Sequence, residues 1–312
     1  MNVLVTGANG FVGRNLCALL ASRGFSVHAA VRSSGGGQPG AASIDIGTMD
    51  GQTNWREVLK EVKIVVHLAA RVHVMSDDVS DPLAEYRTMN VQATTNLARQ
   101  AAQAGVRRLV FVSSIKVHGE STPPGQAFRE TDHPSPQDAY GLSKWEAEQS
   151  LRQIACETGL EVVIIRPPLV YGPQVKANFA VLMRAVQRGW PLPLGAINNA
   201  RSLVALENLA DFIVLCCTHP AAANQAFLIS DGQDLSTAQL VRGLAAAANV
   251  PARLLKIPPW ILELAGRLTG KSQTVQRLCS NLQVDISKAR NRLGWVPVVS
   301  VTEGLRRAFQ GC

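Results

Sequence analysis

The sequence contains no long apolar run, since no stretch approaches the ~20 consecutive apolar residues that a membrane-spanning helix needs. The first residues, Met1 to Leu4, enter an apolar segment without the basic region that opens a signal peptide. Together these absences predict a cytoplasmic protein without membrane insertion. Aromatic residues are also scarce, at 5% of the chain, and the Ala-rich, Val-rich composition favours helices packed on a buried sheet over a sandwich of antiparallel strands.

The six cysteines and six histidines show no ligand-like spacing. The sequence has no Cys-x-x-Cys pair and no Cys/His cluster of the kind that binds zinc. Cys216 and Cys217 are neighbours, and adjacent cysteines form a disulfide only with strain. We therefore expect reduced cysteines that mostly fill packing positions, and no metal site.

The net charge is +8, from 31 Lys and Arg against 23 Asp and Glu, and no basic run concentrates it. The densest basic pairs, Arg107-Arg108 and Arg306-Arg307, lie far apart in the sequence, and no aromatic residues alternate with them as in a single-strand binder. The charge therefore predicts a small phosphate-bearing ligand rather than a nucleic-acid partner.

Length and residue pattern together predict an α/β protein with a second, smaller lobe. At 312 residues the chain exceeds the usual ceiling for one hydrophobic core. Short β-rich runs alternate with helical windows through the first two thirds, which indicates βαβ units around a doubly wound parallel sheet. The expected strands are residues 3–5, 27–31, 64–66, 109–112 and 162–165. The expected helices are residues 11–23, 81–104 and 139–158.

The expected first strand runs directly into Thr6-Gly7-Ala8-Asn9-Gly10-Phe11-Val12-Gly13, and a helix follows. Glycines let the backbone turn sharply and approach a pyrophosphate, whose charge is then held by the N-terminus of the helix. Close packing of a helix on a strand also selects glycine, but the strand-turn-helix context favours a dinucleotide-binding Rossmann domain.

The end of the second expected strand bears on the choice of cofactor. A carboxylate there would bind the ribose 2′-hydroxyl of NAD, but the sequence has Arg32-Ser33-Ser34. A guanidinium and two hydroxyls suit the 2′-phosphate of NADP. The alternative is a solvated arginine at a strand exit. The sequence thus favours NADP and leaves NAD open.

Tyr140 and Lys144 stand four residues apart at the start of an expected helix, so the phenol and the ammonium project from one face. Upstream, an expected strand ends at Ser113-Ser114 and places hydroxyls at its carboxyl end, where ligands meet an open parallel sheet. Downstream, the next strand ends just before Pro167. Two strand ends and one helix start are therefore expected to share one site.

These motifs, in this order, resemble the extended short-chain dehydrogenases/reductases, and within them the NAD-dependent epimerase/dehydratase family of nucleotide-sugar enzymes. The resemblance covers essentially the whole chain and implies a cofactor site at the carboxyl ends of the strands. Its residues would be Gly7, Asn9, Gly10, Phe11, Val12, Gly13, Arg32, Asp45, Ile46, Leu68, Ala69, Ala70, Tyr140, Lys144 and Pro167.

The resemblance also implies the chemistry. Hydride transfer at a carbinol or ketone requires a proton to move on the oxygen, and Tyr140 would donate or accept that proton. Lys144 would hold the nicotinamide ribose and lower the pKa of the phenol, which is about 10 when free. Ser114 would hydrogen-bond the same substrate oxygen. Asn90 resembles a residue that supports the cofactor region, with a purely structural role as the alternative.

The C-terminal lobe is expected to bind the sugar nucleotide. By resemblance, Asn178, Phe179 and Leu194 contact the substrate and Arg201 binds phosphate. Arg277 is either a second phosphate ligand or a plain surface arginine. The expected cofactor domain comprises residues 1–167 plus 202–231, and the expected substrate lobe residues 168–201 plus 232–312. The helices of residues 81–104 and 139–158 resemble those that pair two subunits, so we expect a homodimer.

One departure from the family narrows the reaction. After Ser114 come Ile115 and Lys116, in place of the Asp-Glu pair that eliminates water in 4,6-dehydratases. The leading hypothesis is reduction of the C4 ketone of a UDP-4-keto-6-deoxy-N-acetylhexosamine, for bacterial O-antigen polysaccharide. The alternative is 4-epimerisation of UDP-glucose or UDP-N-acetylglucosamine by the same triad. A third hypothesis is a non-catalytic regulator that senses NADP.

Overall fold

The computed structural model describes residues 1–32, 40–72 and 81–310 of the chain. Its centre is a seven-stranded sheet, in which the strand order is β3-β2-β1-β4-β5-β6-β9 and every neighbouring pair is parallel. The strands are β1 (Asn2–Thr6), β2 (Ser26–Val31), β3 (Ala41–Asp45), β4 (Ile64–His67), β5 (Arg108–Val112), β6 (Glu161–Arg166) and β9 (Ala226–Leu228). The predicted doubly wound Rossmann sheet is therefore confirmed.

Four of the expected strands, β1, β4, β5 and β6, form because their Val/Ile/Leu-rich runs are buried on both faces of the sheet, and the fifth, β2, is buried mainly through its valines and alanines. Two edge strands were not predicted, because their sequences contain no comparable apolar run. β3 (Ala41–Asp45) is only partly buried, and β9 (Ala226–Leu228) is three residues long. The order reverses between β1 and β4, which creates the switch point where ligands of open parallel sheets bind.

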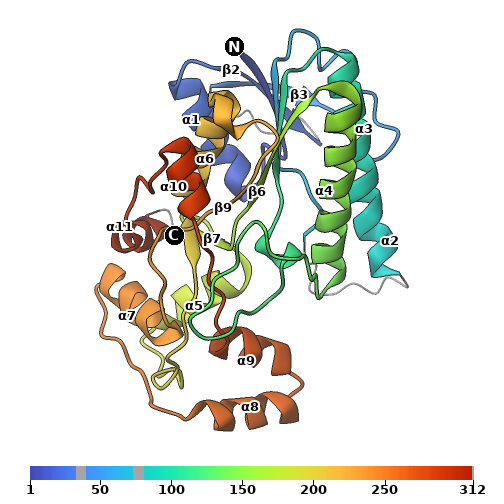
Figure 1. The fold of residues 1–312 in the computed structure, drawn as a ribbon. Coiled ribbons are helices and arrows are strands. Elements are labelled where there is room, and N and C mark those ends of the chain that lie inside the picture. Colours follow the sequence, from blue (N-terminus) through green and yellow to red (C-terminus); the bar gives the residue numbers. More distant parts are fainter. Residues whose placement is uncertain (33–39, 73–80, 311–312) are drawn as a thin grey trace.

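Helices cover both faces of the sheet (Figure 1). One face packs against α1 (Phe11–Ser22), α6 (Leu206–Thr218) and α10 (Ser287–Leu293). The other packs against α3 (Ala93–Gln103) and α4 (Ala139–Thr158). The predicted helix over residues 81–104 is in three pieces, because α2 (Pro82–Tyr86) passes through a π-helical segment, Arg87–Gln92, into α3.

The smaller lobe, which lies below the sheet in Figure 1, has its own apolar core. It is built on a two-stranded parallel sheet, β7 (Leu169–Tyr171) and β8 (Leu203–Ala205). Its helices are α5 (Ala177–Gln187), α7 (Thr237–Ala247), α8 (Pro259–Leu268), α9 (Ser272–Cys279) and α11 (Val301–Ala308). Residues 282–295 pack with the sheet-side core, although the sequence placed them in the lobe. The domain division itself stays a prediction.

Three of the cysteines fill core positions, as the sequence predicted. Cys17, Cys216 and Cys217 are buried, and burial raises the pKa of each thiol, that of Cys217 to about 12. Within residues 1–32, 40–72 and 81–310, no group of three His, Cys, Asp or Glu could hold a metal ion. No helix in those same ranges is long and apolar enough to cross a membrane.

A buried histidine connects β4 to β1, the two strands on either side of the switch point. His67 ends β4 and is 0% exposed; its Nδ1 lies 2.6 Å from the Thr6 hydroxyl and its Nε2 lies 2.9 Å from the Thr94 hydroxyl. Burial, with the nearby charge of Lys144, lowers the pKa of His67 to about 3. The imidazole is therefore neutral in the folded protein at any pH near neutrality.

This histidine should make the folded state sensitive to acid. Between about pH 3 and pH 6.5 the unfolded chain holds a proton on His67 that the folded chain does not, so stability falls as the pH falls through that window. The expected loss for this residue is about 1.4 kcal/mol per pH unit below its unfolded pKa. Urea unfolding at a series of pH values should show a shallower slope for His67→Gln than for the exposed His133→Gln; equal slopes would contradict the assignment.

Candidate functional site

The turn between β1 and α1 forms a cradle that only glycine can line. Gly7 has φ +67°, and a Cβ there would lie 2.8 Å from the Ala69 nitrogen. A Cβ on Gly13 would lie 2.3 Å from the Gly7 carbonyl oxygen. The N-terminus of α1 at Gly10 has no side-chain cap, and its first turn carries no acidic residue. Free backbone N–H groups at a helix start suit a pyrophosphate, so the residues present fit a dinucleotide.

The ends of the next two strands lie beside this cradle. Val31 is paired with Asp45, and the Ile46 nitrogen donates to the Val31 carbonyl at 2.9 Å. Arg32, directly after β2, is exposed and thus stands next to Asp45 and Ile46 at the carboxyl edge of the sheet. The Asp45 carboxylate accepts from the Gly47 nitrogen at 2.9 Å, within its own turn. Ser33 and Ser34, which the sequence grouped with Arg32, lie outside the described residues.

The turn after β4 contains the expected Leu68, Ala69 and Ala70. It is held by β1, because the Ala69 nitrogen donates to the Thr6 hydroxyl at 3.3 Å. Asn90 anchors the next residue: its side chain accepts from the Arg71 nitrogen at 2.8 Å and donates to the Arg71 carbonyl at 3.1 Å. The same amide donates to the Ser143 hydroxyl of α4 at 2.9 Å. These protein contacts show the structural role that the sequence had left open for Asn90.

Ser114, Tyr140 and Lys144 come together at the ends of β5 and α4. Ser114 follows β5 and is half-buried, and Tyr140 is the second residue of α4, whose N-cap Asp138 accepts from the Gly141 nitrogen at 2.7 Å. The N-terminus of α4 abuts the turn after Ser114, since a Cβ on Gly141 would lie 2.7 Å from the Lys116 carbonyl oxygen. This close approach allows a side-chain hydrogen bond between Ser114 and Tyr140.

Burial dominates the titration of the two ionisable groups. It raises the pKa of Tyr140 to about 12, with Asp138 adding to the rise and the Ser114 hydrogen bond opposing it. Burial lowers the pKa of Lys144 to about 7, which the charge of Glu148 opposes. The Lys144 ammonium donates to the Val112 carbonyl at 2.7 Å and lies 4.0 Å from the centre of the Phe111 ring. The pKa of the phenol is therefore raised in the protein alone, and the expected lowering by Lys144 stays a prediction.

A buried ion pair that the sequence analysis missed connects this helix to the sheet. Glu148 and Arg166 are 0% and 2% exposed, and the Arg166 Nε and Nη2 atoms donate to the two carboxylate oxygens at 2.9 and 2.5 Å. The Ser113 hydroxyl donates to the same carboxylate at 2.6 Å, and Arg166 Nη1 lies 2.6 Å from His118 Nε2. The available signal was spacing, since Glu148 stands one turn beyond Lys144.

The two arginines predicted to bind phosphate lie near one carboxylate. Arg277 donates to both oxygens of Glu120, at 3.1 and 3.2 Å. Arg201 donates to the Ser280 carbonyl at 3.1 Å, and its guanidinium is close enough to Glu120 and Arg277 for their charges to act on its pKa. Burial, the largest cause, lowers that pKa. Arg277 is therefore part of a charged cluster with Arg201 and not an isolated surface arginine.

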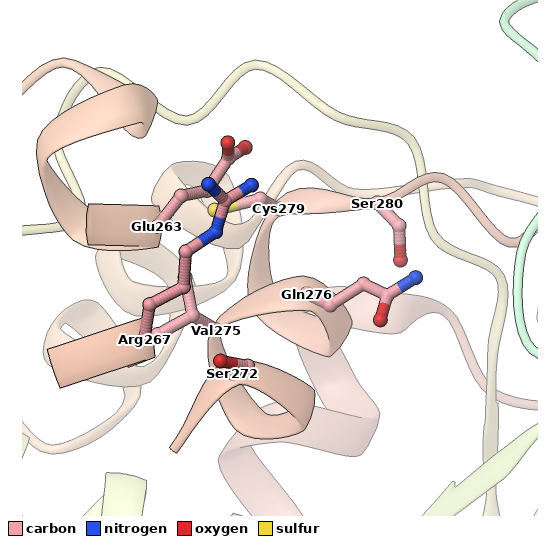
Figure 2. A pocket seen from close by; sticks show the side chains of 7 residues that line it. All are labelled: Glu263, Arg267, Ser272, Val275, Gln276, Cys279 and Ser280. Carbon is pink, nitrogen blue, oxygen red and sulfur yellow. The ribbon is translucent and has the colours of Figure 1, made fainter. Parts of the chain in front are cut away.

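Ser280 also lines a pocket of about 440 Å³ between α8 and α9, which Figure 2 shows from close by.

Of the other predicted substrate residues, Asn178 is exposed at the start of α5. Phe179 and Leu194 are buried in the core of the smaller lobe, with Phe179 stacked on Tyr171 at 5.6 Å between ring centres. Their side chains pack within this core instead of projecting into solvent.

Comparison with known proteins agrees with this geometry. The sequence profile described as the NAD dependent epimerase/dehydratase family matches residues 3–230. A Vibrio cholerae protein named UDP-glucose 4-epimerase is 49% identical over 99% of this chain and 94% of its own length. An Escherichia coli O157:H7 protein named N-acetyl-alpha-D-glucosaminyl-diphospho-ditrans,octacis-undecaprenol 4-epimerase is 30% identical over 99% of this chain and 94% of its own.

Among solved structures, MoeE5 in complex with UDP-glucose and NAD superposes with a TM-score of 0.79 at 26% identity, covering 100% of this chain and 98% of that one. The family match spans most of the chain and includes the glycine cradle, Ser114, Tyr140 and Lys144. The relationship extends over both lobes, because the relatives cover nearly the full length. The chain belongs to the NAD-dependent epimerase/dehydratase family of enzymes.

Proposed function

We propose that the protein is a UDP-sugar 4-epimerase that uses a nicotinamide cofactor. The observation that carries this proposal is the convergence of Ser114, Tyr140 and Lys144 at the sheet edge beside the glycine cradle. The Vibrio cholerae relative named UDP-glucose 4-epimerase supports the choice of reaction over ketone reduction, which the sequence had favoured. Both reactions transfer a proton to or from a sugar oxygen. They differ in the hydride, which an epimerase takes from the sugar and returns to it, and which a reductase delivers to the sugar from its cofactor.

In this proposal each residue of the triad has a separate task. Tyr140 takes the proton of the C4 hydroxyl as the carbon is oxidised and returns a proton to that oxygen as the carbon is reduced. Ser114, which is hydrogen-bonded to Tyr140, positions the C4 oxygen of the sugar. Lys144 supplies positive charge beneath the phenol and a donor for the cofactor ribose. A nicotinamide cofactor held at the glycine cradle and by Lys144 would supply the hydride acceptor for oxidation at C4 and the hydride donor for its reversal.

The smaller lobe would hold the rest of the substrate. We propose that Arg201 and Arg277 bind the diphosphate, which would compete with Glu120 for Arg277. Asn178 would add a polar contact from α5, and Phe179 and Leu194 would set the shape of the wall. Residues 1–167 plus 202–231 would then form the cofactor domain and the remaining residues the substrate lobe. Pairing of two subunits through residues 81–104 and 139–158 stays a prediction.

One observation favours reduction of a UDP-4-keto-6-deoxy-N-acetylhexosamine as a second candidate. Arg32 follows β2 where a carboxylate would select NAD, and its guanidinium is exposed. A reductase must exchange its cofactor in every cycle, which NADPH suits. An epimerase returns the hydride to the same sugar and gains from tight retention of its cofactor. The two candidates therefore predict different stoichiometry.

The deciding experiment follows nicotinamide absorbance and sugar configuration together. With UDP-glucose or UDP-N-acetylglucosamine and NAD present, we expect the 4-epimer to form with no net change in absorbance. With the 4-keto-6-deoxy sugar and NADPH, we expect little consumption. One NADPH oxidised per ketone, without any epimer from the first substrates, would overturn the epimerase proposal in favour of the reductase.

Tyr140→Phe should lower epimerisation by about 10²–10⁴-fold, because the ring stays and the transferable proton is lost. Cofactor binding, measured by titration, should change little. The control is Tyr86→Phe, since Tyr86 packs edge-on against Tyr140 at 6.1 Å but does not carry the transferred proton. We expect that variant to stay within a few-fold of the parent. Near-parental turnover of Tyr140→Phe would remove this residue from the mechanism.

The role of Arg32 can be measured apart from turnover. If its guanidinium meets the 2′-phosphate, Arg32→Ala should weaken NADPH binding by about 1.5–3 kcal/mol and leave NADH binding nearly unchanged. Binding titrations with both cofactors give the comparison, and Arg23→Ala, an exposed arginine after α1, is the matched control. An equal loss for both cofactors would place Arg32 against a part that NADPH and NADH share, and no loss for either would leave it in solvent; both outcomes contradict a 2′-phosphate contact.

A further inference from the structure

Helix α8 presents an apolar face that the rest of the chain does not cover. Trp260, Leu264 and Leu268 are 64%, 51% and 80% exposed, and their i, i+4, i+8 spacing puts them on one side of the helix. The opposite side is in contact with α9, since a Cβ on Gly266 would lie 2.8 Å from Val275. An exposed apolar row of this kind marks an interaction surface. Figure 1 shows α8 at the end of the molecule farthest from the sheet.

The residues around this face are basic. Between residues 253 and 271 there are four Lys or Arg and a single acidic residue, Glu263. Lys256 precedes the helix by three residues, Lys271 follows it by three, and both are exposed. The exposed Leu255 continues the apolar surface toward Lys256. A short helix with Trp and Leu on one side and flanking cations is the pattern that binds the surface of an anionic bilayer.

We propose that the α8 surface, formed by Trp260, Leu264 and Leu268 with Lys256 and Lys271, adsorbs to a membrane containing anionic lipid. The leucines would enter the boundary between headgroups and acyl chains, and the tryptophan would lie at headgroup level. The lysines would remain among the lipid phosphates. Contact of this kind is peripheral, and needs one apolar helix face and no spanning segment.

A second copy of this chain fits the same surface less well. A two-fold contact brings identical patches together, so the four cations of residues 253–271 would face their own copies, and Glu263 is the one acidic residue within that segment. Anionic lipid supplies the missing negative charge without any such repulsion. Because α9 is packed on α8 and carries Arg277, adsorption would also hold the arginine cluster near the bilayer surface.

The test is cosedimentation of the full chain with vesicles of phosphatidylcholine alone or of phosphatidylcholine and phosphatidylglycerol in equal parts. We expect binding to the mixed vesicles, weak binding to the neutral ones, and release by salt. Leu264→Gln with Leu268→Gln should lower the partition coefficient at least tenfold. Lys256→Gln should lower it about fivefold. Trp260 emission should shift to the blue on binding, and Trp260→Phe should lose that shift.

Control variants distinguish binding through the α8 surface from nonspecific adsorption through other exposed apolar side chains. Val296→Gln with Val298→Gln removes two apolar side chains that are as exposed but lie elsewhere, and should bind vesicles as the parent does. The α8 variants replace exposed side chains, so their thermal midpoints and their turnover of soluble substrate should match the parent. Absence of binding to anionic vesicles, or equal loss with the Val296/Val298 variant, would overturn the proposal. Conversion of a dimer to a monomer by the α8 variant, without vesicle binding, would assign the surface to a second copy.

Discussion

The site depends on the buried ion pair between Glu148 and Arg166. Both groups are removed from water, so separating them would leave an uncompensated charge at a cost of about 3–5 kcal/mol. Their contact fixes α4 on the end of β6, and the Ser113 hydroxyl on the same carboxylate adds the end of β5. The helix that carries Tyr140 and Lys144 is therefore held at one position against the strand that leads to Ser114.

The same burial that positions the triad also sets its protonation. Tyr140 is held as a neutral phenol by a pKa near 12, and Lys144 has lost most of its usual preference for the charged form. Desolvation works on the two groups in opposite directions, since it disfavours phenolate and ammonium alike. The Tyr140 phenol is therefore neutral in the protein alone, while Lys144 still carries part of its charge near neutral pH, and that charge favours loss of the phenol proton in the proposed transfer.

The two lobes show different physical designs. Around the parallel sheet, the packing contacts are mostly apolar, and polar groups at the strand ends pair with one another, as with His67 between Thr6 and Thr94. In the smaller lobe, cations gather around Arg201 and Arg277 and along α8, with Glu120 and Glu263 as the nearby acids. A rigid apolar platform therefore carries the reacting groups, and a basic lobe faces the anionic part of the ligand.

The sequence by itself determined the parallel sheet, the glycine cradle and the Tyr140/Lys144 pair. Each follows from local spacing: continuous Val/Ile runs, glycines where a Cβ would clash, and two side chains one helical turn apart. Only the tertiary structure decided the contacts between distant segments, such as Glu148 with Arg166 and Arg277 with Glu120, 157 positions apart. It also decided that the Tyr140 pKa is raised. Burial controls both outcomes, and the burial of a side chain depends on packing by segments that its own neighbourhood in the sequence does not contain.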